Sequence, residues 1–160
     1  MLPEINTILY ASDMGKASRP AFLRAVSEAV QHDAQITYLH VMEPMNRSTE
    51  TMIESYLSEE VLDSLRDKGV DAMKVKMIKR VNDVIREELT DIELPHGTPN
   101  CHIESGQPNE VILAVAKEIN ADLIVMGTRT HSSIGKLLMG STAQKVLQSS
   151  DIPVLVVPLS

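Results

Sequence analysis

Short apolar runs alternate with helical stripes along this chain. Residues 5–11 form an apolar, β-branched run that stops at a Ser-Asp-Met-Gly turn, as a buried strand would. Apolar residues then recur with helical spacing from Ser18, a candidate N-cap. The same alternation predicts further strands at residues 35–42, 100–104, 122–126 and 153–157, with helices that begin at Pro108 and near Gly140.

The middle of the chain is harder to interpret. Apolar positions between residues 61 and 89 predict a long helix, which Gly69 could bend or interrupt because glycine costs about 1 kcal/mol relative to alanine inside a helix. Residues 47–58 give no clear pattern, and residues 94–99, with two prolines and a glycine, end the helical pattern.

Strands and helices therefore alternate, which predicts an α/β fold. We expect a single domain over residues 1–160, built on one open five-stranded parallel sheet of order 3-2-1-4-5 with helices on both faces. The last two strands are continuous apolar runs, as is typical of strands buried on both faces.

Composition narrows the function classes. The chain has 160 residues and a net charge of −7, with one Phe, three Tyr and no Trp, so we expect an aliphatic core. Neither the charge nor the aromatic content suits a nucleic-acid binder. Cys101 is the only cysteine, which fits a reducing, cytoplasmic setting. No apolar stretch approaches the roughly 20 residues of a membrane span, and no signal peptide is evident.

Candidate chemistry lies just after the predicted strands, because ligands of open α/β sheets bind beyond the carboxyl ends of the strands. The positions that follow the first two strands are Ala11, Ser12, Asp13 and Val41. Residues 127–142, after the fourth strand, are rich in glycine, hydroxyl and basic residues and contain no Asp or Glu.

This glycine-rich stretch has the features of a phosphate site. Gly127 lacks a Cβ and allows close backbone approach, while Gly140, Ser141 and Thr142 precede a helix whose N-terminal N–H groups attract anions. Arg129, with His131 and Lys136, adds positive charge. A P-loop is excluded because the positions that would need glycine and a hydroxyl residue hold Thr130 and Leu137.

The sequence resembles the universal stress protein family. ATP-binding members carry Gly, two residues, Gly, nine residues, then Gly and Ser or Thr; Gly127 and Gly140-Ser141 match this spacing, and Thr130 replaces the middle glycine. The resemblance weakens between residues 47 and 98. Other matches are Ser12-Asp13, Leu39-His40-Val41, Gly106-Gln107-Pro108, the run from Leu123 to Gly127 and the run from Pro153 to Val157.

The resemblance implies an ATP site, with Mg or Mn among the phosphates. Asp13 would contact adenosine, and Val41 would meet adenine through its backbone. Gly140, Ser141 and Thr142 would hold the phosphates, while the ribose and phosphate track would be lined by Met126, Gly127, Thr128, Arg129 and Thr130. One hydrogen bond lost at Thr130 would cost about 1.5–3 kcal/mol, or roughly 10- to 150-fold in affinity.

Each feature also has a plain structural interpretation. Gly127 could simply end a strand, Gly140-Ser141 could only start a helix, and Asp13 could be a turn residue. His40 is interpreted as a hydrogen-bonded histidine near the core.

Three functions stay open at this stage. The chain is a nucleotide-responsive regulatory protein that acts on an unknown protein partner, a stress-response interaction protein with an empty crevice, or a slow ATPase. No catalytic motif is present, so the sequence supports binding rather than turnover. The apolar strand between Val154 and Val157 would lie at a sheet edge, and we expect it to pair with a second copy in a homodimer.

Overall fold

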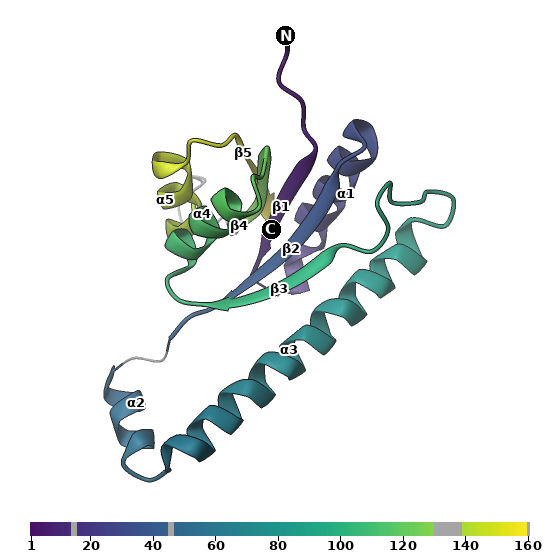
Figure 1. Cartoon of the computed structure of the whole chain (residues 1–160). Helices are drawn as coiled ribbons and strands as arrows, with labels where there is room; N and C mark the ends of the chain where they lie inside the picture. Colours follow the sequence, from purple (N-terminus) through teal and green to yellow (C-terminus); the bar gives the residue numbers. More distant parts are fainter. Residues whose placement is uncertain (14–15, 45–46, 130–138, 160) are drawn as a thin grey trace, which may run out of the picture.

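A computed structural model of the chain describes residues 1–13, 16–44, 47–129 and 139–159. Its centre is one five-stranded, all-parallel sheet of order β3-β2-β1-β4-β5, which confirms the predicted fold (Figure 1). The strands are β1 (Thr7–Ser12), β2 (Gln35–Met42), β3 (Asn100–Ser105), β4 (Leu123–Arg129) and β5 (Val154–Leu159).

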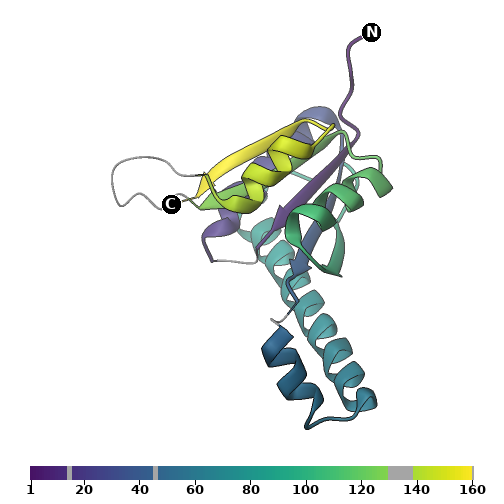
Figure 2. The ribbon, with the colours of Figure 1, turned by 90° about the vertical axis from the view of Figure 1, so that its left-hand side faces the viewer.

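Helices lie on both faces of this sheet. A short 3₁₀ turn, η1 (Lys16–Ser18), leads into α1, and the helices are α1 (Arg19–His32), α2 (Arg47–Glu54), α3 (Glu59–Glu88), α4 (Pro108–Glu118) and α5 (Ser141–Ser149). The core residues of α1 and α3 pack on one face, and those of α4 and α5 pack on the other (Figures 1 and 2). Among the described residues, no helix combines the length and apolarity needed to cross a membrane.

The two faces have different cores. The cluster under α4 and α5 is aliphatic, as expected from the composition. The cluster under α1 and α3 contains Tyr10, Phe22 and Tyr38, whose ring centroids are 5.0–5.6 Å apart. The expectation of a wholly aliphatic core is therefore wrong for this face. The few aromatic residues of the chain are concentrated there, where ring contacts add to the burial of apolar area.

The N-cap residue of α1 is the one predicted from the sequence. Ser18 occupies the N-cap position, but its side chain makes no capping hydrogen bond there. Its hydroxyl instead lies 3.4 Å from Nη1 of Arg80 on α3, so it links two helices. At the other end Asp33 adopts a left-handed conformation (φ 54°) and donates its backbone N–H to Ala29, which terminates the helix before β2.

Helix α3 is the longest element, with 30 residues, or about 45 Å at the α-helical rise. It is continuous through Gly69, so that glycine does not interrupt it. Its buried residues, Met77, Val81 and Val84, all lie in its second half. Figures 1 and 2 show that the first half extends beyond the sheet, beside α2. We call α2 together with residues 59–76 the arm.

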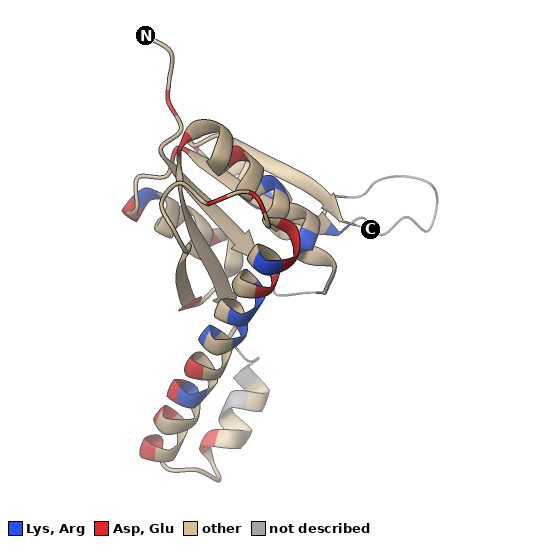
Figure 3. Ribbon diagram, turned by 90° about the vertical axis from the view of Figure 1, so that its right-hand side faces the viewer, with Lys and Arg blue, Asp and Glu red and all other residues tan. Residues whose placement is uncertain are grey.

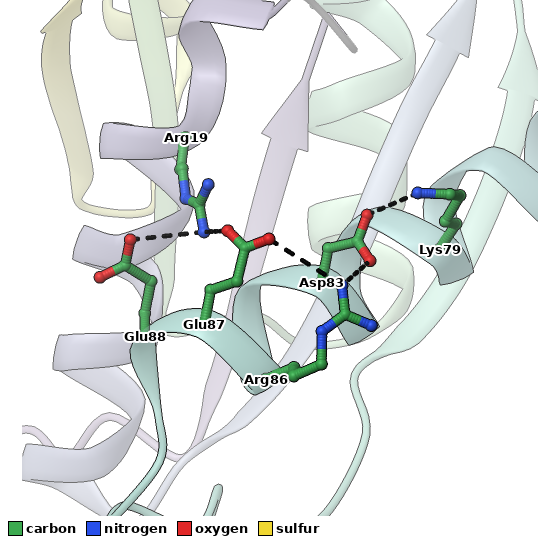
Figure 4. A network of polar contacts seen from close by, with 6 residues as sticks. All are labelled: Arg19, Lys79, Asp83, Arg86, Glu87 and Glu88. Carbon is green, nitrogen blue, oxygen red and sulfur yellow. Dashed lines mark hydrogen bonds and ion pairs between the residues drawn. The ribbon is translucent and has the colours of Figure 1, made fainter.

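Ion pairs fasten the second half of α3. Arg19 on α1 reaches Glu87 at 2.6 Å and Glu88 at 3.3 Å, while Asp83 accepts from Lys79 at 2.7 Å and from Arg86 at 2.8 Å (Figure 4). The hydrogen bond from Lys79, with the charges of Lys79 and Arg86, lowers the pKa of Asp83. These pairs are exposed, so each contributes little alone. The Arg19 pairs join α1 to α3, whereas both Asp83 pairs lie within α3. The burial of Met77, Val81 and Val84 holds this end of α3 to the sheet.

Candidate ligand crevice

A crevice of about 350 Å³ opens at the carboxyl ends of β1 and β4. The chain leaves β1 toward β2 on one side, and β4 lies on the other side, so this is the point where strand order reverses. All of the predicted binding residues except Thr130 line the crevice: Ala11, Ser12, Asp13, Val41, Met126, Gly127, Thr128, Arg129, Gly140, Ser141 and Thr142. Thr130, His131 and Lys136 lie outside the described residues.

One wall of the crevice is apolar. Leu39 comes from β2 and Met126 from β4, while Pro108 and Ile112 come from α4. The pairing of β1 with β2 ends at Ser12 and His40, so Val41 lies one residue beyond it while still paired with Glu104 of β3. A flat apolar ring could therefore lie against aliphatic side chains and meet the edge of β2 at Val41.

The N-terminus of α5 forms the opposite, polar end of the crevice. Gly140 is its N-cap residue and provides no side-chain cap, and Ser141 and Thr142 begin the helix at the crevice wall. The first turn of a helix presents backbone N–H groups and a partial positive charge. This end of the crevice is therefore suited to an anion such as phosphate.

Thr128 holds this helix end in place. Its Oγ1 accepts a 2.7 Å hydrogen bond from the backbone N–H of Gly140. Thr128 is buried, and a Cβ on Gly140 would lie 3.1 Å from the same oxygen. Gly140 thus fits closely against the end of β4, so the start of α5 is fixed relative to the strand. Both residues were predicted at the site from the sequence, but no sequence pattern indicated this bond.

An ion pair spans the mouth of the crevice. Arg129, at the end of β4, approaches Asp13, just after β1, with 2.9 Å between Nη2 and Oδ2. Both side chains are about half exposed. The family resemblance implied a contact between Asp13 and adenosine and a place for Arg129 on the phosphate track, as two separate contacts. In the structure each balances the charge of the other, which the linear sequence could not reveal because 116 positions separate them.

Gly127 has a packing role that the sequence did not predict. A Cβ at this position would lie 2.4 Å from Cδ1 of Leu159, on the neighbouring strand β5. The space left by the missing side chain is therefore filled by the chain's own leucine. Gly127 still lines the crevice, and it allows Leu159 to be buried beside it. Its conformation is not left-handed, so packing space explains the glycine.

Sequence reasoning missed several lining residues. His40 lines the crevice and pairs through Nδ1 with the carbonyl oxygen of Ser12, at 2.9 Å. Its hydrogen bond agrees with the interpretation made from the sequence, whereas its place in the crevice was not foreseen. Glu43 adds a carboxylate to the rim. Their positions at the end of β2, close to Val41, were the available signal.

Tyr10 closes the floor of the crevice. It is buried, and its hydroxyl donates to the carbonyl oxygen of Ser18 at 3.2 Å. Burial, the largest cause, raises the pKa of Tyr10, so this hydroxyl stays protonated and acts as a donor at neutral pH. Tyr10 and Ser18 also line a second cavity of about 250 Å³ between α1 and α3, so the two cavities share a wall.

The described residues hold no preformed metal site. Within residues 1–13, 16–44, 47–129 and 139–159, no group of three or more His, Cys, Asp or Glu side chains is placed to bind an ion. Asp13 and Glu43 are the carboxylates that line the crevice.

The fold and the crevice together define an open, doubly wound α/β domain with a crevice at its topological switch point. The chain matches the model of the universal stress protein family over residues 4–158. It belongs to the universal stress protein family.

Curated relatives and solved structures agree with this assignment. The chain is 32% identical over 152 residues to a universal stress protein of Thermus aquaticus, covering 95% of this chain and 98% of that protein. It is 30% identical over 161 residues to the stress response protein NhaX of Bacillus subtilis, covering 95% and 97%. The structure of the universal stress protein UspA from Lactobacillus plantarum aligns with a TM-score of 0.67 at 26% identity, covering 98% and 99%.

Proposed function

We propose that this chain is a nucleotide-responsive regulatory protein of the stress response, and that its crevice binds an adenine nucleotide, with ATP as the first candidate. One observation carries the proposal: the crevice combines an apolar wall at Val41 with an uncapped helix N-terminus at Ser141. An apolar slot suits a purine base, and a helix N-terminus suits phosphate.

The base and ribose would occupy the β1–β2 side. Adenine would lie against Leu39, Met126 and Ile112 and contact the backbone at Val41. Asp13 would accept a hydrogen bond from a ribose hydroxyl, in competition with Arg129 at 2.9 Å. Ribose binding would therefore loosen this ion pair and direct Arg129 toward the phosphates. This movement of Arg129 would change the protein surface at the mouth of the crevice.

The phosphates would lie at the start of α5. Ser141 and Thr142 supply hydroxyl groups and first-turn N–H groups, while the N–H of Gly140 is already bonded to Thr128. Mg or Mn would bind to the phosphate oxygens, since the described residues offer no site of their own. A universal stress protein solved in complex with cAMP has the same fold at 19% identity and a TM-score of 0.63. That likeness extends to the fold alone.

Equilibrium binding of labelled ATP, with and without Mg, tests the proposal. Wild-type protein should bind saturably, with a Kd at or below the millimolar range. Ser141→Glu places a carboxylate at the phosphate end and should weaken binding at least about 100-fold, because like charges brought together cost several kcal/mol. Mass spectrometry of small molecules that copurify with the wild-type protein identifies the natural ligand.

Ser149→Glu is the matched control. Ser149 is at the other end of α5, outside the crevice, so this change adds the same charge without touching the site. It should leave ATP affinity unchanged. Absence of saturable binding by the wild-type protein at millimolar ATP would contradict the proposal and favour an interaction protein with an empty crevice.

Phosphate release tests hydrolysis separately. We rank binding above turnover because Asp13, which faces the crevice, is already paired with Arg129. Release no faster than a buffer blank is the expected result. Release that Ser141→Glu abolishes would instead support the slow ATPase.

The proposed homodimer would use β5. This strand is the edge of the sheet, and Val154, Leu155, Val156 and Val157 are each partly exposed. An apolar edge strand pairs readily with another copy. Sedimentation should give at least twice the chain mass of 17.6 kDa, and a mass of 17.6 kDa at micromolar protein would contradict this dimer.

A further inference from the structure

The arm contains a helix that its own chain does not bury. From residue 59 to residue 76, α3 has no buried residue, and Gly69 lies in the middle of this stretch. Helices without tertiary packing are marginal in water, and an internal glycine costs about 1 kcal/mol more. Such a helix is stabilised when a second element covers its apolar side.

Three of the four exposed large apolar side chains of α3, those of Val61, Leu65 and Val75, lie on one stripe, and Ile78 lies off it. The stripe positions alternate in spacing between four and three residues, which is the heptad pattern of a two-helix seam. Val61 is 44% exposed, Leu65 52% and Val75 68%. The members of this seam are Val61, Leu65, Lys68, Ala72, Val75 and Lys79.

The rest of the chain leaves the seam uncovered. The half-buried residues of the arm part of α3 include Leu62, Val70 and Met73, and helical geometry places them on a different side of the helix from Leu65 and Val75. This other side continues into Met77, Val81 and Val84, which pack on the sheet. The helix therefore has one side for its own chain and a second side with no cover from the described residues.

Charge along α3 identifies the partner. Residues 59–71 are acidic on balance, whereas residues 72–80 contain only basic charges; Figure 3 shows this change of sign along the helix. The acids are Glu59, Glu60, Asp63, Asp67 and Asp71, against Arg66 and Lys68. The later bases are Lys74, Lys76, Lys79 and Arg80. In an antiparallel pair of this helix, each acidic half lies along the basic half of the other copy.

We propose that the arm is a self-association surface, in which the seam of α3 packs antiparallel against the same seam of a second copy. A two-fold axis near Val70 places Leu65 of one copy opposite Val75 of the other, twice. It also places Lys68 opposite Ala72 and Val61 opposite Lys79, where the lysine stems cover apolar surface. The ammonium group of Lys79 can keep its contact with Asp83. Such an interface is self-complementary, as two-fold symmetry requires.

This surface is distinct from the β5 edge. The arm extends from the sheet beside β3, and β5 is the opposite edge of the sheet (Figure 1). Two separate two-fold interfaces on one chain would give tetramers or longer assemblies rather than dimers. The two interfaces can therefore be tested independently.

Disulfide trapping between two different variants tests the pairing. In a Cys101→Ser background, Leu65→Cys and Val75→Cys proteins are prepared separately, mixed and oxidised mildly. The antiparallel seam predicts that the mixture forms a disulfide-linked dimer at least about tenfold faster than either variant alone, because pairing raises the effective thiol concentration. Both seam side chains are exposed on the helix surface, so the substitutions should not disturb folding.

Val30→Cys, on α1, is the matched control. Val30 is 39% exposed but lies outside the arm, and mixing it with either arm variant should give only the slow background rate. Lys74→Glu with Lys76→Glu should slow trapping of the mixture, since residues 72–80 would then lose the net positive charge that faces the acidic half of the other copy. Equal rates for the mixture and the Val30 control would overturn the proposal. Faster trapping of Leu65→Cys with itself would overturn the antiparallel arrangement.

Discussion

The carboxyl end of the sheet and the arm are built on opposite principles. At the sheet, residues far apart in sequence fit closely: Gly127 leaves room for Leu159, and Thr128 binds Gly140. In the arm, α2 and residues 59–76 have side chains that are mostly exposed, and their helices are local structures. The difference teaches that the crevice is fixed by the fold, whereas the arm is available for contacts outside the chain.

Removing methionine side chains sharpens this comparison most strongly. Met77 is fully buried where α3 meets the sheet. Met77→Ala should lower the free energy of unfolding of the protein by about 2–5 kcal/mol, because burial is lost and a cavity remains. Met52 lies on α2 and is 61% exposed, so Met52→Ala should lower the free energy of unfolding by no more than about 0.5 kcal/mol. Urea denaturation measures both. Equal losses would show that the arm is packed as tightly as the sheet.

The next largest effect is expected from glycine-to-alanine changes, which should lower stability at one glycine and raise it at the other. Gly127→Ala would place a methyl group 2.4 Å from Leu159 and should destabilise the protein by about 1–3 kcal/mol. A methyl group at Gly69 would meet no other atom within 4 Å, so Gly69→Ala should stabilise α3 by up to about 1 kcal/mol. Thermal unfolding provides the measurement. A stabilising Gly127→Ala would contradict the packing role of that glycine.

Threonine-to-valine changes test the hydrogen bond between Thr128 and Gly140, which positions α5. Thr128→Val removes the acceptor for the Gly140 N–H and should cost about 1 kcal/mol of stability, together with a several-fold loss of ATP affinity. Thr51→Val, at an exposed site on α2, should change neither quantity appreciably. Calorimetry of ATP binding and urea denaturation provide the two readouts. Unchanged ATP affinity in Thr128→Val would mean that this bond does not position the phosphate site.

The smallest expected effect concerns acid stability at the root of α3. Lys79 and Arg86 lower the pKa of Asp83 in the folded state. Its stabilising contribution is therefore complete above the unfolded pKa of about 4 and is lost as the pH falls through the lowered folded value. Asp83→Asn should flatten the pH dependence of stability below about pH 4, and salt should shrink the difference.

Asp67→Asn is the matched change on the arm, outside the network of Figure 4. The Asp67→Asn protein should show the same pH dependence of unfolding free energy below about pH 4 as the wild-type protein. If both variants reduced this pH dependence equally, the effect could not be assigned to the contacts of Asp83 with Lys79 and Arg86.

The sheet was predictable from sequence because its signals are local and repeated. Each strand is a short apolar run, and alternation with helices forces parallel pairing, which brings Asp13, Val41 and Gly127 to one edge. The contacts at that edge were not predictable. The Asp13–Arg129 pair and the packing of Leu159 against Gly127 depend on the register of β4 with β1 and β5, which no local pattern encodes.

The arm was poorly predicted for a different reason. In residues 47–58 the apolar positions do not face a core, so periodicity had no buried side to report, although α2 forms there. Gly69 suggested a break that the helix does not have, because one glycine lowers helix stability without abolishing it. Hydrophobic periodicity indicates which residues are buried by their own chain, and few residues of the arm are buried in this way.

Amide chemical shifts during an ATP titration test the central claim most directly. The account predicts saturable shifts at Ser12, Val41, Ser141 and Thr142, with little change along residues 59–76. Ser141→Glu should suppress these shifts in an otherwise native spectrum. No saturable shifts up to millimolar ATP, or shifts confined to residues away from the crevice, would contradict a nucleotide site at the carboxyl ends of β1 and β4.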